Sequence, residues 1–145
     1  MRIHPFALFG LAVSCGAVQA EQRIACPAEV TSSQMSVRAP AGWTGFYAPD
    51  IKLRLQGAGA MLGPLKLMGV LQGEVTQKGE AVVHRFDMTG GVSDQLEKWM
   101  VCTYKGNVYQ AFKLPMATRA CTVTYRRDAD PKADPPYAVG SILCE

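Results

Sequence analysis

Four cysteines that follow an export signal restrict this chain more than any other feature. Arg2 gives the leader a positive start, residues 5–15 are mostly apolar, and Val18-Gln19-Ala20 has the small-x-small pattern that precedes a signal-peptidase site. We therefore predict that residues 1–20 are a signal peptide, cleaved after Ala20. The protein is then periplasmic or secreted, and its thiols meet an oxidising compartment.

A lipoprotein signal is the alternative reading of the leader. Cys15 follows the small residues Ala12, Val13 and Ser14, although Ala12 stands where such signals usually have leucine. A lipid on Cys15 would anchor the chain to a membrane and would favour a structural role at the cell surface. Without that lipid we expect no membrane association.

The cysteines beyond the leader predict two disulfides, because their number is even and a zinc site would need paired spacings such as Cys-x-x-Cys. They are Cys26, Cys102, Cys121 and Cys144. We favour Cys102–Cys121 with Cys26–Cys144, which would join the two ends of the domain. If the strands that carry Cys102 and Cys121 lie two strand spacings apart, about 10 Å, that pair cannot form. Cys26–Cys102 with Cys121–Cys144 is then the next choice.

Residues 21–145 are long enough for one domain with a modest core, and short alternating segments between turn residues predict that it is all-β. We expect an antiparallel β-sandwich or barrel-like domain stapled by disulfides, with one short helix near residues 93–99. The glycine-rich residues 57–64 are predicted to be a flexible loop. The predicted strands cover residues 35–39, 43–47, 51–55, 65–71, 80–88, 98–105, 108–114, 121–126 and 138–144.

The hairpin around Gly106-Asn107 permits a more detailed prediction. If these two residues form the loop, Tyr104 lies opposite Tyr109 and Cys102 lies opposite Ala111. Both faces of the strand pair would then be apolar. We therefore expect this pair to be buried on both sides.

The charge of the chain argues against a nucleic-acid partner. Without the leader there are fourteen basic and twelve acidic residues, and no basic stripe is present. Arg126 and Arg127 are the only adjacent basic pair, and Asp128 and Asp130 follow them, as is typical of a solvated turn. We retain the two arginines as candidate contacts for a partner.

The sequence has no strong catalytic constellation. His84 is the only histidine outside the leader, which leaves no second histidine for a metal site and no serine motif for a triad. Residues 57–63 have the spacing G-x-G-x-x-x-G, and Pro64 blocks the helix that a dinucleotide site requires. We predict no cofactor and no metal. An envelope hydrolase that uses carboxylates such as Asp87 and Glu97 is the alternative function.

Two segments are the candidate recognition loops of a binding domain. Residues 57–64 carry Met61 and Leu62, which could enter a groove on a partner. Residues 128–136 form a polar loop stiffened by prolines, and long loops on rigid sheets often carry recognition. The alternative for the first segment is a loop folded back onto its own core.

The spacing of cysteines and aromatic residues resembles a family of small exported proteins of proteobacteria. Cys26-Pro27, Trp99-x-x-Cys102-x-Tyr104, Leu114-Pro115, Cys121-x-Val-x-Tyr125 and Cys144 carry the resemblance. Some members lie near type VI secretion genes, where small exported proteins often neutralise an effector that attacks the cell envelope. The resemblance thus implies an immunity protein or inhibitor with another protein, a secreted effector or envelope enzyme, as its partner. It supplies no catalytic residues.

Overall fold

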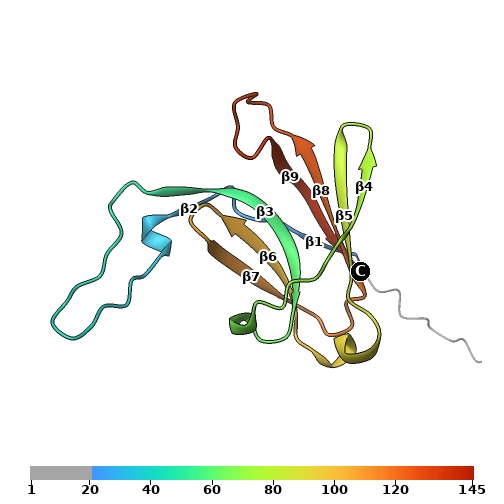
Figure 1. Ribbon diagram of the computed structural model, residues 1–145, viewed down its shortest axis with the longest axis horizontal. Helices are drawn as coiled ribbons and strands as arrows, with labels where there is room; N and C mark the ends of the chain where they lie inside the picture. Colours follow the sequence, from blue (N-terminus) through green and yellow to red (C-terminus); the bar gives the residue numbers. More distant parts are fainter. Residues whose placement is uncertain (1–20) are drawn as a thin grey trace, which may run out of the picture.

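A computed structural model describes residues 21–145 as two antiparallel β-sheets (Figure 1). The leader, its cleavage after Ala20 and the possible lipid site at Cys15 lie outside the described residues. The sheets have the strand orders β1-β9-β8-β5-β4 and β2-β3-β6-β7. The strands are β1 (Gln22–Ile24), β2 (Glu29–Thr31), β3 (Lys52–Leu62), β4 (Glu74–Lys78), β5 (Ala81–Asp87), β6 (Lys98–Tyr104), β7 (Val108–Leu114), β8 (Ala120–Arg127) and β9 (Tyr137–Cys144).

The all-β prediction is confirmed, and the helical content consists of short 3-10 turns. These are η1 (Ser32–Gln34), η2 (Leu65–Leu67) and η3 (Gly91–Gln95). Instead of the helix expected near residues 93–99, the chain forms only the turn η3, which ends at Gln95. A longer helix is not formed because β6 already begins at Lys98. No helix within residues 21–145 has the length and apolar character needed to cross a membrane.

The main core lies between the two sheets. Alternate residues of each strand face inward, as the pleat requires, so that Ala60 and Met100 of one sheet join Phe86, Val123 and Ile142 of the other. The sheets are also joined by Tyr125 of β8. Its hydroxyl accepts a hydrogen bond from the Ala58 amide (3.1 Å) and donates one to the Ala58 carbonyl (2.7 Å). A smaller cluster surrounds Tyr104 near β2.

The disulfides are Cys26–Cys102 and Cys121–Cys144, so the favoured pairing was wrong. Cys121 of β8 lies directly opposite Cys144 of the neighbouring strand β9, with Cα atoms 4.1 Å apart. Cys102 belongs to the other sheet. Its partner Cys26 lies between β1 and β2, where the chain passes from one sheet to the other.

The β6–β7 hairpin has a different register from the predicted one. Tyr104 lies opposite Val108 rather than Tyr109, because the turn contains three residues, with Gly106 and Asn107 both at positive φ. Cys102 lies opposite Gln110 rather than Ala111. Strand β6 is largely buried, but β7 is the sheet edge and exposes Tyr109 and Phe112. The pair is therefore not buried on both sides.

The glycine-rich segment is not a loop. Residues 57–62 continue β3 and pair with β6 from Gly57–Thr103 to Leu62–Lys98. Glycine and alanine have a low strand propensity, but pairing with β6 supplies the backbone hydrogen bonds that hold this segment as a strand. Residues 65–71 instead form η2 and a short connection with a single bridge from Val70 to Met61.

Candidate functional site

The candidate partner contacts from the sequence are not brought together. Met61 is only 6% exposed and Leu62 is half-buried, since both lie in β3. Arg126 and Arg127 are exposed at the end of β8, in the other sheet, beside Lys78 and Glu80. The partner-binding role of these residues stays a prediction.

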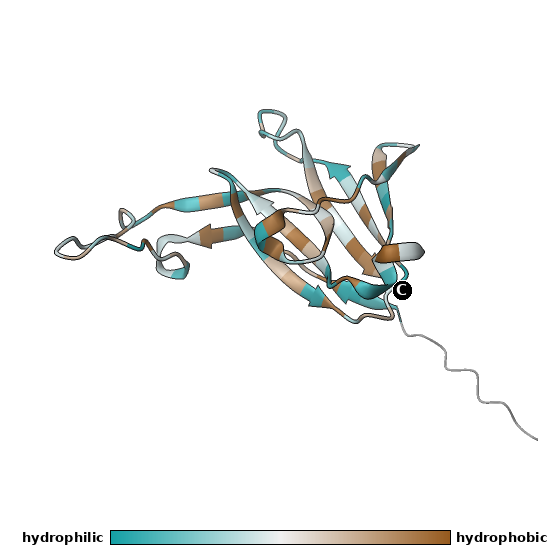
Figure 2. Cartoon of the chain, turned by 60° about the horizontal axis from the view of Figure 1, so that its bottom comes forward, coloured by the Kyte–Doolittle hydropathy of each residue, from teal (hydrophilic) through white to brown (hydrophobic). Residues whose placement is uncertain are grey.

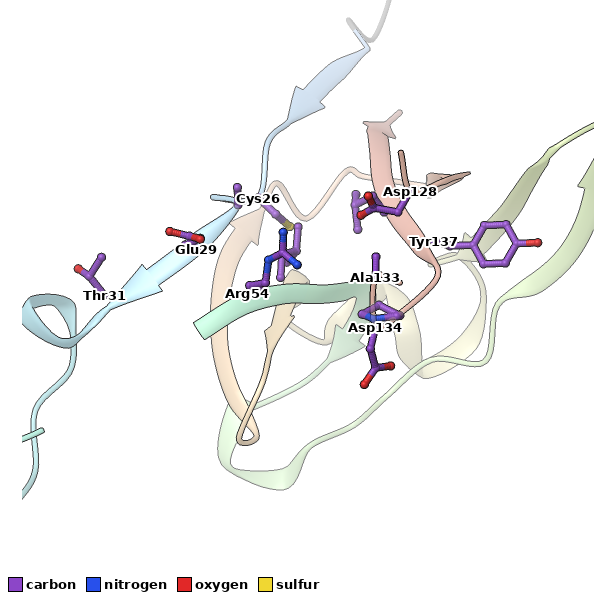
Figure 3. Close-up of a pocket in the computed structure, with 13 residues that line it drawn as sticks. Cys26, Glu29, Thr31, Arg54, Asp128, Ala133, Asp134 and Tyr137 are labelled. Carbon is purple, nitrogen blue, oxygen red and sulfur yellow. The ribbon is translucent and has the colours of Figure 1, made fainter. Parts of the chain in front are cut away.

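The second recognition loop, residues 128–136, forms one wall of a cleft of about 590 Å³. Figure 3 shows Arg54 of β3 between β2, which carries Glu29, and the loop that carries Ala133 and Asp134. Asp128 also lines the cleft, so three acidic residues and one arginine share its walls. Within the described chain Arg54 makes no ion pair, so its charge is open to solvent and to a partner.

A long connection between η1 and β3 extends away from both sheets. We call residues 35–50 the aromatic arm; it is the blue-green loop at the left of Figure 1, and Figure 2 shows the same projection from another angle. Trp43 is 77% exposed and Phe46 is 78% exposed. Tyr47 and Val37 are also exposed. Sequence reasoning predicted strands at 35–39 and 43–47, and this was wrong because neither segment finds a partner strand.

The root of the arm borders the cleft and is held by short-range hydrogen bonds. Thr31, which lines the cleft, ends β2, and its amide donates to the side-chain oxygen of Gln34 (2.9 Å). The Ser32 amide donates to the Ile51 carbonyl (3.0 Å), which joins the two ends of the arm. Thr31 pairs with Lys52 in the β2–β3 ladder. The root of the arm and the cleft therefore meet at Thr31.

The side chains of His84, Asp87 and Glu97 all have structural contacts. The ring of His84 lies 5.0 Å from that of Tyr125, centroid to centroid. The Thr89 hydroxyl and amide donate to Asp87 and hold the pKa of that carboxyl below its usual range. A general acid needs a raised pKa, so Asp87 is unsuited to that role. Glu97 is paired with Lys113.

The side chains that could bind a metal ion are scattered in the described part of the chain. Among residues 21–145, no three side chains of His, Cys, Asp or Glu are placed to hold a metal ion. The four cysteines in this range are all in disulfides, so none is available as a thiolate ligand or nucleophile.

Fold and surface together define a disulfide-linked β domain whose exposed features suit contact with another macromolecule. Residues 50–145, about two thirds of the chain, match the family described as type VI secretion system Tli immunity protein, and the chain belongs to this family. It is therefore an immunity protein, as the resemblance to exported proteins near type VI secretion genes implied. No curated protein and no solved structure matches the chain.

Proposed function

We propose that the mature protein works in the periplasm, where it binds an effector enzyme delivered by a type VI secretion system and blocks that enzyme. The observation that carries this proposal is the family match over residues 50–145. Two disulfides support the location, because such bonds persist outside the reducing cytoplasm. Protection then comes from binding alone, without chemistry on a substrate.

The surface supports a binder more than the alternative hydrolase. Hydrogen bonds from Thr89 lower the pKa of Asp87, and Glu97 is engaged with Lys113. Retaining and inverting hydrolases instead need two carboxyl groups facing one substrate, one of them with a raised pKa. The exposed arm and the charged cleft beside it provide the contact area that a protein partner requires.

Protection against an effector tests the function and its compartment together. Each type VI effector of the same genome is sent to the periplasm of a host strain, with or without this protein. We expect the chain with its leader to restore growth against one effector. A variant that lacks residues 2–20 should not protect, because it never meets the effector and its cysteines stay reduced.

Two outcomes of this assay would contradict the proposal. Protection by the leaderless variant would place the encounter in the cytoplasm. Failure of the leader-bearing chain against every effector, with the chain shown to be present and oxidised in the periplasm, would remove the immunity function.

The processing site is checked by the mass of the protein purified from the periplasm. We expect a chain that begins at Glu21 and carries two disulfides, which make it four hydrogens lighter than the reduced chain. A Cys15→Ala variant should give the same mature mass. A lipid-modified chain that begins at Cys15, and that is lost in this variant, would show an anchored protein instead.

A further inference from the structure

The aromatic arm has the composition of a binding element. Trp43 and Phe46 expose more than three quarters of their surface, whereas Phe86 and Tyr104 in the core are almost fully buried. From Ala39 to Pro49 there is no charged residue. Large exposed aromatic residues on a projecting loop are costly in water, and tryptophan and tyrosine are enriched among the residues that dominate protein interfaces.

The arm is also preorganised along its length. At its root, Met35 packs against the cluster that contains Tyr104, and the Met35 amide donates to the Ser32 carbonyl (3.2 Å). In the middle, the two limbs touch, because a Cβ on Gly45 would lie 2.6 Å from the Val37 carbonyl oxygen. A loop whose limbs are in contact loses less conformational freedom when it binds than an open loop would.

The tip of the arm is closed by a tight turn that presents Trp43. The Trp43 amide donates to the Pro40 carbonyl (3.0 Å), and Gly42 between them has φ of +82°. This is the third position of a type II turn, which requires a positive φ and therefore favours glycine. The turn fixes the backbone at the residue that carries the exposed indole.

We propose that the aromatic arm is the main contact with the effector, and that Trp43 and Phe46 enter an apolar concave surface of that enzyme. The inference rests on the proposed function, and it names the part of this chain that recognises the partner. All of the arm except Asp50 lies outside residues 50–145, which match the family, so this contact belongs to the chain's own N-terminal part and would select its particular effector. The cleft with Arg54 borders the arm root and forms the polar rim of the same interface.

The test measures the affinity of the purified protein for the effector that the protection assay selects. We expect Trp43→Ala and Phe46→Ala each to weaken binding about 30-fold, and the double variant at least about 100-fold, as for interface residues that dominate affinity. Phe112→Ala is the matched control, because it removes the same side chain from an exposed place on β7. It should change the affinity less than about threefold.

The preorganisation of the aromatic arm is tested separately by replacing one of two glycines with alanine. Gly45→Ala should push the limbs of the arm apart and weaken binding about tenfold, although both aromatic residues remain. Gly59→Ala is the control, because a Cβ there meets nothing within 4 Å. Circular dichroism and thermal unfolding should be unchanged in the aromatic variants, since their side chains lie in solvent.

The outcomes separate this inference from the function on which it rests. If the wild type protects and the double variant binds equally tightly, the arm is not the contact and the immunity function stands. If the wild type binds no effector, both fail. A concentration-dependent dimer, or binding to vesicles of anionic phospholipid, that is lost in the double variant while effector binding is kept would assign the arm to a second copy or to a membrane, and would overturn the inference.

Discussion

Tyr125 shows how one side chain can join two sheets. Its phenol satisfies both backbone groups of Ala58 in β3, and burial raises the pKa of the Tyr125 hydroxyl above its usual range. The ordinary value for tyrosine is about 10. The folded protein therefore holds this proton more tightly than the unfolded chain does.

A Tyr125→Phe variant should lose stability and part of its alkaline sensitivity. Removing the hydroxyl leaves the Ala58 amide and carbonyl without these partners, which costs about 1–3 kcal/mol. In the wild type, the stability present below about pH 10 is lost as the pH rises through the raised folded pKa, because the unfolded chain ionises first. The measurement is denaturant unfolding between pH 7 and pH 11.

The decisive quantity is how steeply the free energy of unfolding falls with pH above about pH 10. Tyr104 also has a pKa raised by burial, so the variant should have a smaller alkaline loss rather than none. An alkaline loss equal to that of the wild type would show that Tyr125 does not contribute to it.

At the scale of elements, two glycines in and beside β3 differ in the space available for a side chain. A Cβ on Gly69 would lie 2.4 Å from the Leu62 carbonyl oxygen, which is backbone and cannot move aside easily. We expect Gly69→Ala to destabilise the protein by about 1–3 kcal/mol. Gly59→Ala, in open space on β3, should change stability by less than about 0.5 kcal/mol.

Chemical unfolding of both variants provides the check. Equal stabilities would mean that the connection after η2 can shift away from β3 without cost. A loss in Gly59→Ala as large as in Gly69→Ala would contradict the open space found around a Cβ at Gly59.

The sequence predicted the strands that have clear alternation, and its failures have specific physical reasons. Residues 80–88 and 108–114 were recognised within a residue or two of β5 and β7. The three-residue turn at Gly106 shifted the register of the hairpin, because two-residue and three-residue loops can share the same glycine and asparagine. Residues 57–62 became strand only through pairing with β6, a tertiary effect that local composition does not report.

The candidate site was less accessible to sequence reasoning than the fold. Alternation within residues 35–47 favours strands, but the residues have no neighbour to pair with. The available signal was the turn at Pro40 and Gly42, followed by three aromatic residues without a charged residue between them. Whether such residues face a core or solvent depends on which strands assemble, and a single sequence does not determine that.

At the scale of the whole molecule, the two disulfides close loops of very different size. Their sequence separations are 76 residues for Cys26–Cys102 and 23 for Cys121–Cys144. In the chain-entropy model they restrict the unfolded chain by about 4.5 and about 3.4 kcal/mol. The longer loop also encloses the aromatic arm.

Replacing each cysteine pair with alanine should therefore destabilise the protein to different degrees. We expect the Cys26→Ala/Cys102→Ala variant to be about 1 kcal/mol less stable than the Cys121→Ala/Cys144→Ala variant. Denaturant unfolding of both purified proteins measures the difference. The reverse order would show that the packing of Cys121 and Cys144, both almost fully buried, outweighs the loop term.

The bond between Cys26 and Cys102 has a practical consequence for anyone who trims the protein. Cys102 lies inside the family-matched residues, whereas Cys26 precedes them by more than twenty positions. A recombinant fragment that starts at residue 50 would contain an odd thiol and two uncovered sheet edges, along β9 where β1 had been and along β3 where β2 had been. Such a fragment would cross-link or aggregate when oxidised, so recombinant production should begin at Glu21.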